Sequence, residues 1–289
     1  MMFTVAAEES GLPVIDFLQL RIPAAPQAYL RQLVKRGKVL RSAQPLSLSD
    51  LLHGGDVLRL PDSGRLRELY ATPAPLNQPV IVLYESREIL VVDKPAGLAV
   101  HSSQGHEQDN LTNRVEALLS RRGDHFSVAP VHRLDLETSG PVIFGKGRQA
   151  CAELGKMFMR HEVDKYYLAM VSGETRGAGR LCSAVPAKGK SKQALTEFRA
   201  LLRNRQASLI EIRLGTGRQH QIRRHLAQNG HPLFGDRRYG GPCAKNLARL
   251  FLHSCRLSFV DPFSGAQLDI ESDLPPDLSR FRDTLFPAD

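Results

Sequence analysis

Residues 131–140 read VHRLDLETSG and lead into the apolar run 142–144, which has the composition of a buried strand. Asp135 lies between two leucines, so we expect its carboxylate to be partly withdrawn from water. Two hydroxyl residues and a glycine follow, and they suit a tight loop that would aim the carboxylate. Such an aspartate is a candidate nucleophile or general base. Taken alone, these residues leave open an Asp135 that only caps a turn and a His132 that is structural.

Strand-like and helix-like stretches continue on both sides of this loop, from about residue 80 onward. Hydrophobic periodicity predicts strands within 81–84, 89–92, 142–144, 166–171, 195–201, 208–214 and 250–259, and helices over 111–120, 150–161 and 219–228. The order is not a strict alternation of strand and helix. We therefore predict an α+β domain with a mixed or antiparallel sheet rather than a doubly wound parallel one.

The first 61 residues have the pattern of a small module of their own. Apolar residues at helical spacing precede a stop at Gly37, and short strand-like runs joined by turns follow up to Leu60. Pro61, Gly64, Pro73, Pro75 and Pro79 then mark a stretch typical of a linker. The sequence predicts a small α/β module over 1–61, a Pro-rich linker over 62–79 and a larger domain over 80–289.

A second polar cluster, GTGRQHQIRRHL, occupies residues 215–226. Its glycines precede a helix-like run, which would place backbone N–H groups and arginines around an anion site. It lacks the Gly-Lys-Ser/Thr ending of a phosphate-binding P-loop. His220 and His225 are five positions apart, the wrong spacing for two ligands on one helix face, so we predict no metal site.

A third cluster is Lys165-Tyr166-Tyr167-Leu168-Ala169. Adjacent tyrosines on a strand point to opposite faces, so one can pack into the core while the other faces a cleft. A ring in that position could stack on a nucleic-acid base, an interaction that contributes ~1–3 kcal/mol. Two core tyrosines remain the alternative interpretation.

The net charge of +9 over 289 residues is concentrated in one window. Residues 199–249 contain eleven Lys or Arg residues and only two acidic ones, so this window carries a charge equal to that of the whole chain. Ten of the eleven are arginines, whose planar guanidinium suits phosphate oxygens and base edges. The pattern predicts a polyanionic partner, with a solvated basic face as the alternative.

Several protein classes are excluded by composition. The chain is 42% hydrophobic and 24% charged, which is incompatible with a disordered protein. Its four cysteines have no short spacing, so we expect reduced thiols rather than a zinc or redox site. We see no apolar run of membrane-spanning length and no signal peptide, and we expect a cytoplasmic protein with no membrane partner.

The three clusters, in this order, resemble motifs of the RluA-type family of RNA pseudouridine synthases. The resemblance extends to segments that begin at Asp93-Lys94-Pro95-Ala96-Gly97, His231-Pro232-Leu233, Gly235-Asp236, Tyr239-Gly240 and Leu252-His253. It covers roughly residues 80–275. It implies the pseudouridine synthase fold, with a mixed, mainly antiparallel sheet and a central catalytic cleft.

The resemblance also implies the site. Asp135 would be the catalytic carboxylate, Arg223 its partner and Tyr167 the residue that stacks on the target uracil. The substrate-binding residues would be Arg133, Ile222, His132, Thr138, Arg218 and His220, with Arg133 entering the position vacated by a flipped base. Attack on the ribose, attack on the ring and removal of a ribose proton all stay open. No cofactor or metal is implied, and we expect a monomer acting on ribosomal RNA, with the large subunit favoured, or on transfer RNA.

The N-terminal module resembles the alpha-L RNA-binding motif that many family members carry. It departs from that motif at residues 14–18, at Ala24-Ala25-Pro26 and at Arg41-Ser42-Ala43, where an Asn-Gly turn is typical. Two rival functions follow from the same residues. One is an RNA-binding or ribosome-assembly factor without chemistry, and the other a glycosidase, which usually needs two acidic residues flanking the bond.

Overall fold

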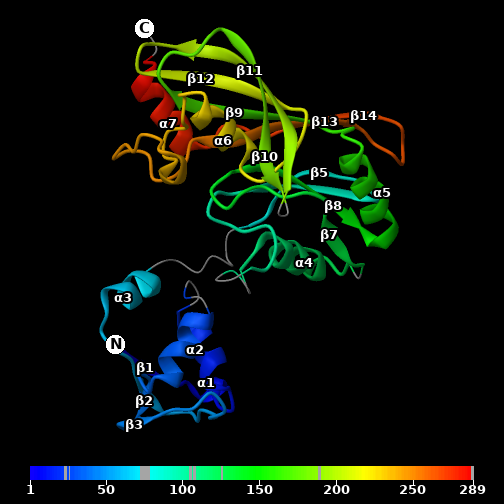
Figure 1. Ribbon diagram of the computed structural model, residues 1–289. Coiled ribbons are helices and arrows are strands. Elements are labelled where there is room, and N and C mark those ends of the chain that lie inside the picture. Colours follow the sequence, from blue (N-terminus) through cyan, green and yellow to red (C-terminus); the bar gives the residue numbers. More distant parts are fainter. Residues whose placement is uncertain are drawn as a thin grey trace. The chain divides into compact units, whose positions relative to one another are not determined.

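The computed structural model describes residues 1–22, 25, 27–71, 79–103, 106, 109–124, 126–187 and 190–287 (Figure 1). The chain forms two compact units. The N-terminal unit contains Met1–Pro79 and His101–Arg114, and the larger unit contains Val80–Val100 and Val115–Asp289. The sequence did not indicate that residues 101–114 group with the N-terminal unit. Two expectations, the helix start at Ala24 and Pro26 and a phosphate contact by Lys188, lie outside the described residues.

The N-terminal unit is a small antiparallel sheet covered by helices. Its strands are β1 (Met2–Thr4), β2 (Leu40–Arg41), β3 (Gln44–Pro45) and β4 (Val57–Arg59), in the order β1-β4-β2-β3. Its helices are the 3-10 helix η1 (Ala7–Glu9), α1 (Val14–Arg21), α2 (Gln27–Lys35) and α3 (Gly64–Ala71). Phe17, Leu18 and Leu30 are fully buried in its core, so α1 and α2 contribute part of the apolar surface that holds this unit together.

The turn between β2 and β3 forms without the usual residues. Ser42 and Ala43 have φ angles of 48° and 69°, so both central residues adopt the left-handed conformation that an Asn-Gly pair normally supplies. The turn is completed by the pairing of Arg41 with Gln44. Having Ser42 and Ala43 in place of Asn-Gly therefore leaves the geometry of the turn unchanged and raises the conformational free energy needed to form it.

Helix α3 lies within the stretch that its prolines and glycine predicted to be a linker. Leu66 on this helix is fully buried and belongs to the N-terminal core. The five-residue spacing of Asp62 and Arg67 allows a salt bridge of 2.6 Å beside it. Residues 64–71 are therefore a packed helix, and the interpretation of this part as linker is corrected.

The larger unit contains two antiparallel sheets. One has the order β5-β6-β8-β7, from Ile81–Glu85, Ile89–Lys94, Gly140–Lys146 and Val128–Pro130. The other has the order β10-β11-β12-β9-β13-β14, from Ala178–Ala187, Lys190–Arg203, Ala207–Leu214, Asp164–Ser172, Leu252–Val260 and Gln267–Glu271. Its helices are α4 (Leu111–Arg121), which belongs to this unit from Val115 onward, α5 (Gly147–Met159), α6 (Gln221–Gln228) and α7 (Pro276–Leu285), with the 3-10 helix η3 (Arg237–Tyr239). The α+β prediction is confirmed.

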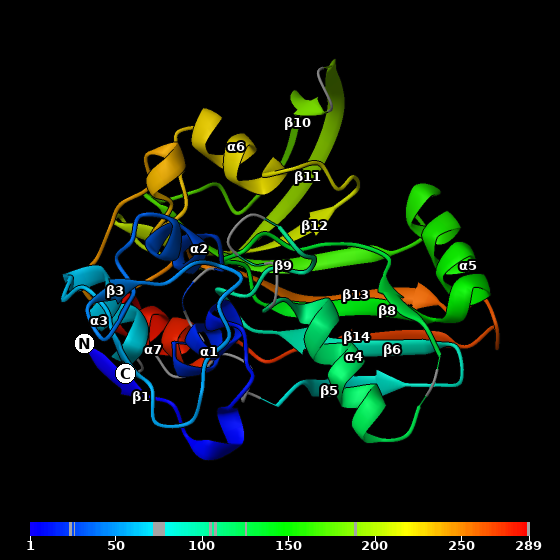
Figure 2. The same cartoon turned by 90° about the horizontal axis from the view of Figure 1, so that it is seen from below.

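The two sheets meet along β8 and β13, as the neighbouring ribbons in Figure 2 show. A single parallel bridge joins Ser139 to His253, and every paired strand of the described sheets is antiparallel. Strand β8 is buried over all but its last residue, which explains its apolar sequence. The loop 131–140 therefore ends where the two sheets join.

The packing of the helices explains the elements that the sequence did not reveal. Phe281 of α7 lies with its ring centroid 5.5 Å from that of Phe234, and with Leu278 it buries one apolar side of the helix. The other unpredicted elements are β7, β10 and β14, which are short or mix small and polar residues. No helix in the described part of the chain has the length and apolar character needed to cross a membrane.

Candidate active site

The backbone of the loop 135–138 is held from its N-terminal side by strand β6 and the turn after it. The carbonyl of Leu136 accepts hydrogen bonds from Nζ of Lys94 at 3.1 Å and from the backbone N–H of Gly97 at 2.8 Å. The carbonyl of Asp135 accepts from the N–H of Thr138 at 3.1 Å, which closes the turn. The carboxylate of Asp135 therefore projects from a backbone whose position is fixed on both sides of it.

Lys94 is completely buried and makes three hydrogen bonds. Its Nζ donates to the carbonyls of Pro95 at 2.9 Å, Leu98 at 2.8 Å and Leu136 at 3.1 Å. Burial, followed by the positive charge of Arg249, lowers the pKa of Lys94 to about 7. Three carbonyls require three donors, and only the ammonium form supplies them.

Strand β13 and the segment before it hold the other end of the loop. The N–H of Ser254 donates to the carbonyl of Ser139 at 2.8 Å, and Oγ of Ser139 lies 3.0 Å from Nδ1 of His253. Gly140 has a φ of 125°, and a Cβ there would collide with the carbonyl oxygen of Ser254. Nη1 of Arg249 donates to the carbonyl of Glu137 at 3.1 Å. The glycine is thus required for the close approach of the loop to β13.

The side chain of Asp135 is partly exposed, at 21%. Its Oδ2 lies 3.7 Å from Nη1 of Arg223 and 3.7 Å from Nε2 of His220. Both distances are too long for hydrogen bonds, and the distance to the Arg223 guanidinium is short enough for a strong charge interaction in a partly buried site. The structure thus brings together three residues that the sequence singled out, from the loop 131–140 and from the start of α6.

The main partner of Arg223 is Asp236, and the expected pairing with Asp135 is present as a second, longer contact. Nε and Nη2 of Arg223 donate to the two carboxylate oxygens of Asp236 at 2.6 and 2.7 Å. Burial opposes the charge on Arg223, but these hydrogen bonds and the charges of Asp236 and Asp135 outweigh it and raise the pKa of Arg223. The guanidinium is therefore fixed by one carboxylate and turns its remaining Nη1 toward the other.

Asp236 was not expected to belong to the site. Its side chain is fully buried and also accepts from the N–H groups of Arg238 and Tyr239, both at 3.2 Å, so it caps η3. One signal was available, because Asp236 is one of only two acidic residues in the basic window 199–249. Lys94 is the second residue that the sequence did not identify as part of the site.

Two side chains that were expected to contact the base, Tyr167 and Ile222, are buried. Tyr167 of β9 is 7% exposed and is paired with Ser254 across the sheet. Burial raises the pKa of Tyr167, and the negative charge of Asp135 acts in the same direction, so the hydroxyl stays neutral. Ile222, next to Arg223 on α6, is 4% exposed.

His132 is placed differently from the other predicted substrate contacts. Its Nε2 accepts from the backbone N–H of Ile143 at 3.0 Å, and its ring stacks on that of Phe158 at 4.7 Å between centroids. Burial, together with the charge of Lys165, lowers the pKa of His132 to about 3, so the ring is neutral. These contacts tie the loop to β8 through His132, and its expected substrate contact stays a prediction.

The remaining predicted residues differ in exposure. Arg133 is exposed, whereas Thr138 is 2% exposed. Within the described residues no hydrogen-bond partner reaches Oγ1 of Thr138 or Nε of Arg218, both of which are buried atoms. The backbone N–H of Arg218 donates to the side chain of Gln221 at 3.0 Å, which orders the residues before α6.

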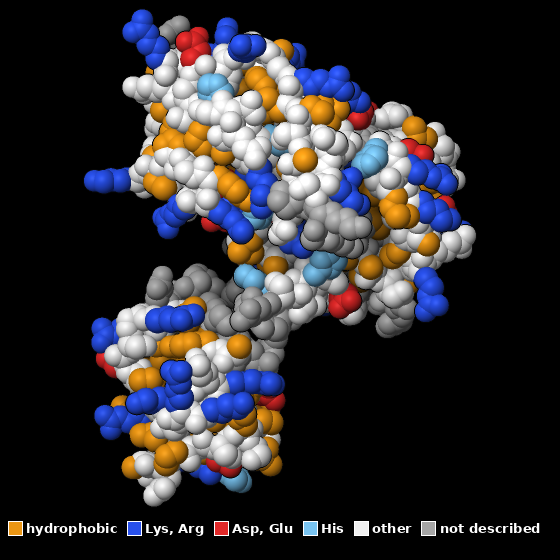
Figure 3. Space-filling model, viewed as in Figure 1, with side chains coloured by type: hydrophobic (Ala, Val, Ile, Leu, Met, Phe, Trp, Pro, Cys, Tyr) orange, Lys and Arg blue, Asp and Glu red, His pale blue; other side chains and the backbone are white. Residues whose placement is uncertain are grey.

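Part of the basic window is neutralised within the protein. Four of its arginines form ion pairs with an acidic residue: Arg199 with Glu211, Arg213 with Asp164, Arg223 with Asp236 and Arg249 with Asp277. Lys and Arg side chains nevertheless predominate over acidic ones on the face displayed in Figure 3. The net charge that the window 199–249 can offer to a polyanionic partner is therefore positive but smaller than the +9 counted from its sequence.

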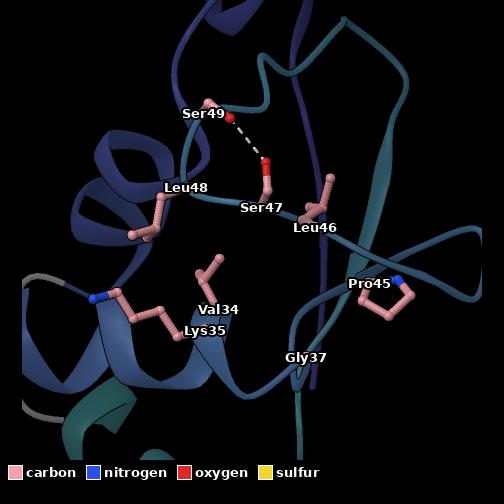
Figure 4. Close-up of a pocket in the computed structure, with 8 residues that line it drawn as sticks. All are labelled: Val34, Lys35, Gly37, Pro45, Leu46, Ser47, Leu48 and Ser49. Carbon is pink, nitrogen blue, oxygen red and sulfur yellow. Dashed lines mark hydrogen bonds between the residues drawn. The ribbon is translucent and has the colours of Figure 1, made fainter.

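A shallow hollow of about 440 Å³ lies in the N-terminal unit (Figure 4). It is lined by Val34 and Lys35 of α2, by Gly37 and by residues 45–49. It belongs to a different unit from Asp135 and holds none of the predicted site residues. Among the residues that the structure describes, no three His, Cys, Asp or Glu side chains converge as metal ligands would.

The fold and the arrangement around Asp135 define a class of RNA-modifying enzyme. The chain has the fold of a solved human protein, RNA Pseudouridylate Synthase Domain Containing 4, with a TM-score of 0.59 at 23% identity over 70% of this chain and 93% of that chain. A sequence model of the family described as RNA pseudouridylate synthase matches residues 88–228.

Two relatives extend this likeness. Ribosomal large subunit pseudouridine synthase C of Vibrio vulnificus is 30% identical over 94% of this chain and 92% of its own length. Ribosomal large subunit pseudouridine synthase D of Zymomonas mobilis is 34% identical over 71% of this chain and 72% of its own length. The chain therefore belongs to the RNA pseudouridine synthase family, and it is an isomerase that acts on uridine in RNA.

Proposed function

We propose that this enzyme converts specific uridines of large-subunit ribosomal RNA to pseudouridine, with Asp135 as the nucleophile. The observation that carries the proposal is the Asp135 carboxylate itself. It projects from a fixed loop, faces one cation 3.7 Å away and makes no hydrogen bond to a described residue that would occupy it. The ribosomal target is supported by the names of relatives that align with nearly the whole chain.

The main group that the reaction requires is a carboxylate. The bond between base and ribose breaks, the base turns, and the ribose rejoins at a ring carbon, so no atom is gained or lost overall. Asp135 supplies the carboxylate that separates base from sugar. Arg223 places a positive charge beside that carboxylate, because Asp236 holds the guanidinium in position.

The detached base must be held while it turns. Tyr167 offers a buried ring with a neutral hydroxyl for stacking on the uracil, and Ile222 offers an apolar surface to the base. Arg133 is exposed, so its guanidinium can enter the RNA and fill the position of the flipped nucleotide. Thr138, Arg218 and His220 complete the substrate contacts.

Outside the active site, the enzyme binds RNA mainly through the charges of basic side chains. Arginines outside the internal ion pairs, such as Arg224, Arg237 and Arg238, contact phosphates, and the Lys and Arg side chains on the face of the N-terminal unit shown in Figure 3 add to them. In this proposal the enzyme acts as a monomer in the cytoplasm, where ribosomal RNA is found. RNA affinity is then expected to fall steeply as salt rises, and an affinity insensitive to salt would contradict this part.

The test is nucleotide-resolution mapping of pseudouridine in total RNA from a strain that lacks this protein. We expect one or a few sites to disappear from large-subunit ribosomal RNA and to return with the wild-type chain. Asp135→Asn is the matched control, because it should bind RNA but restore no site. Loss confined to transfer RNA would overturn the ribosomal target, and no loss at all would favour a binding factor.

A further inference from the structure

His220 has an unusual backbone conformation at the start of α6. Its φ and ψ angles are 53° and 27°, so it is a non-glycine residue in the left-handed region. Such conformations persist only where surrounding contacts over-determine them. They often occur at functional sites, so the contacts of the His220 ring are of interest.

The two ring nitrogens of His220 face different partners. Nδ1 lies 3.0 Å from Oη of Tyr239, a hydrogen bond, and the two rings meet edge to face at 88°. Nε2 lies 3.7 Å from Oδ2 of Asp135. The imidazole thus connects η3 to the carboxylate of the loop 131–140.

The charges around the ring keep it neutral. The guanidinium carbons of Arg223, Arg224 and Arg238 lie 5.1, 5.5 and 5.9 Å from the centroid of Tyr239. Burial lowers the pKa of His220, and these three arginines add to the effect, whereas Asp135 opposes it. A neutral imidazole has one N–H, so either Nδ1 or Nε2 carries the proton.

The geometry selects the tautomer. A carboxylate oxygen opposite Nε2 is attracted by an N–H and repelled by a lone pair, so the proton belongs on Nε2. Nδ1 is then the acceptor, and Tyr239 must be the donor of the 3.0 Å hydrogen bond. The phenol can do so because it is a donor as well as an acceptor.

We propose that Tyr239 and His220 are positioning residues for Asp135: Tyr239 fixes the tautomer of His220, whose Nε2–H, with Nη1 of Arg223, faces Oδ2 and leaves Oδ1 to the substrate. Both contacts described for the carboxylate, with Nε2 of His220 and Nη1 of Arg223, are with Oδ2. The inference deepens the proposed function, since it rests on Asp135 as the reacting group. It adds that Oδ1 is the carboxylate oxygen of Asp135 that faces the substrate.

The first test measures the tautomer in the free protein and needs no RNA. Nitrogen-15 NMR of histidine-labelled protein, with His220 assigned by its absence in His220→Gln, should show the proton on Nε2. Tyr239→Phe removes the donor to Nδ1, which frees that lone pair and should raise the pKa of His220. A proton on Nδ1, or a pKa unchanged in Tyr239→Phe, would overturn the proposal.

The second test measures turnover. A glutamine amide can replace Nε2–H and an asparagine amide can replace Nδ1, so His220→Gln should retain more of kcat than His220→Asn. Tyr239→Phe should lower kcat about tenfold with little change in KM, whereas the exposed Tyr70→Phe should leave both unchanged. Equal kcat for the two His220 variants at equal Tm would contradict the positioning role.

The two sets of results separate this inference from the proposed function. If Asp135→Asn proved active, the nucleophile would be wrong while the NMR result on the tautomer would still stand. If Asp135→Asn were inactive and the tautomer were on Nδ1, the nucleophile would stand and the positioning role would fail.

Discussion

Two aspartates face the same arginine and are held in opposite ways. The carboxylate of Asp236 is fully buried and accepts four hydrogen bonds, two from Arg223 and two from the backbone of η3. The carboxylate of Asp135 is 21% exposed and has Arg223 and His220 3.7 Å away, while its backbone is fixed. The side chain of Asp236 stabilises the structure around it, whereas the structure around Asp135 fixes the position of its side chain.

The contacts of these two carboxylates therefore distinguish a structural carboxylate from a reactive one. A group that must form a bond with substrate needs an oxygen free of other partners and a position fixed by its backbone. A group that must hold an arginine needs both oxygens occupied. Substitutions at the two positions should therefore affect different properties.

Asp135→Asn should give the largest effect on activity. The side chain keeps its shape and loses the negative oxygen, so turnover should fall by at least ~10⁴-fold, which corresponds to about 5 kcal/mol in the barrier. RNA affinity should remain, and Tm should change little because the carboxylate makes no short hydrogen bond. Measurable pseudouridine formation by this variant in single-turnover assays would contradict the assignment.

Asp236→Asn should give the largest effect on stability. It leaves Arg223 buried beside a neutral amide, and breaking a buried pair from one side costs about 3–5 kcal/mol. Denaturant unfolding of this variant and of Asp135→Asn measures the contrast directly. Equal unfolding free energies for the two variants would remove the distinction between them.

Lys94→Met should destabilise the protein by about 3 kcal/mol, because three buried carbonyls lose their donor. The pKa of Lys94 is lowered to about 7 from its usual value near 10.5, so the unfolded chain binds the proton more tightly. The contribution of Lys94 to the unfolding free energy should therefore rise as pH increases from about 7 toward 10.5. Unfolding curves of wild type and variant across this range test the sign, and a contribution that falls with pH would refute it.

Arg133→Ala should lower turnover about 10–100-fold, since one stacking and hydrogen-bonding side chain contributes ~1–3 kcal/mol. The exposed position predicts an unchanged Tm. Arg148→Ala, an exposed arginine on α5, is the matched control and should behave as wild type. A fluorescent base analogue at the target uridine would show whether the defect is in flipping.

Lys156→Met should have the smallest effect. Its pair with Glu153 is solvent-exposed at 2.7 Å, and such pairs contribute less than about 0.5 kcal/mol. It also serves as the control for Lys94→Met, because the same substitution is made at the surface. A loss as large as that of Lys94→Met would show that burial is not the cause.

Much of the larger unit could be predicted from the sequence. The apolar run 142–144 and the helix-like run 219–228 correspond to β8 and α6, because periodicity follows directly from burial. Strand β10 could not be predicted, since it mixes small and polar residues and is defined by pairing with β11.

The site was predicted less completely than the fold. Asp135, Tyr167 and Arg223 were predicted as site residues, and the contact of Arg223 with Asp135 is present, but Asp236 as its main partner and Lys94 were overlooked. Both depend on contacts between residues far apart in the chain, such as the 42 positions that separate Lys94 from Leu136. The local sequence shows which residue types are present, but it does not show which residues contact one another in the folded chain.

The anchors of the loop 131–140 also set an order of events during synthesis. The loop is held by Arg249 and Ser254, more than 100 positions further along the chain, and Arg249 is itself paired with Asp277. A nascent chain that has not yet released these segments from the ribosome has an unanchored Asp135. Asp135 is therefore expected to reach its fixed position only after these segments have left the ribosome, because contacts across long sequence separation close last.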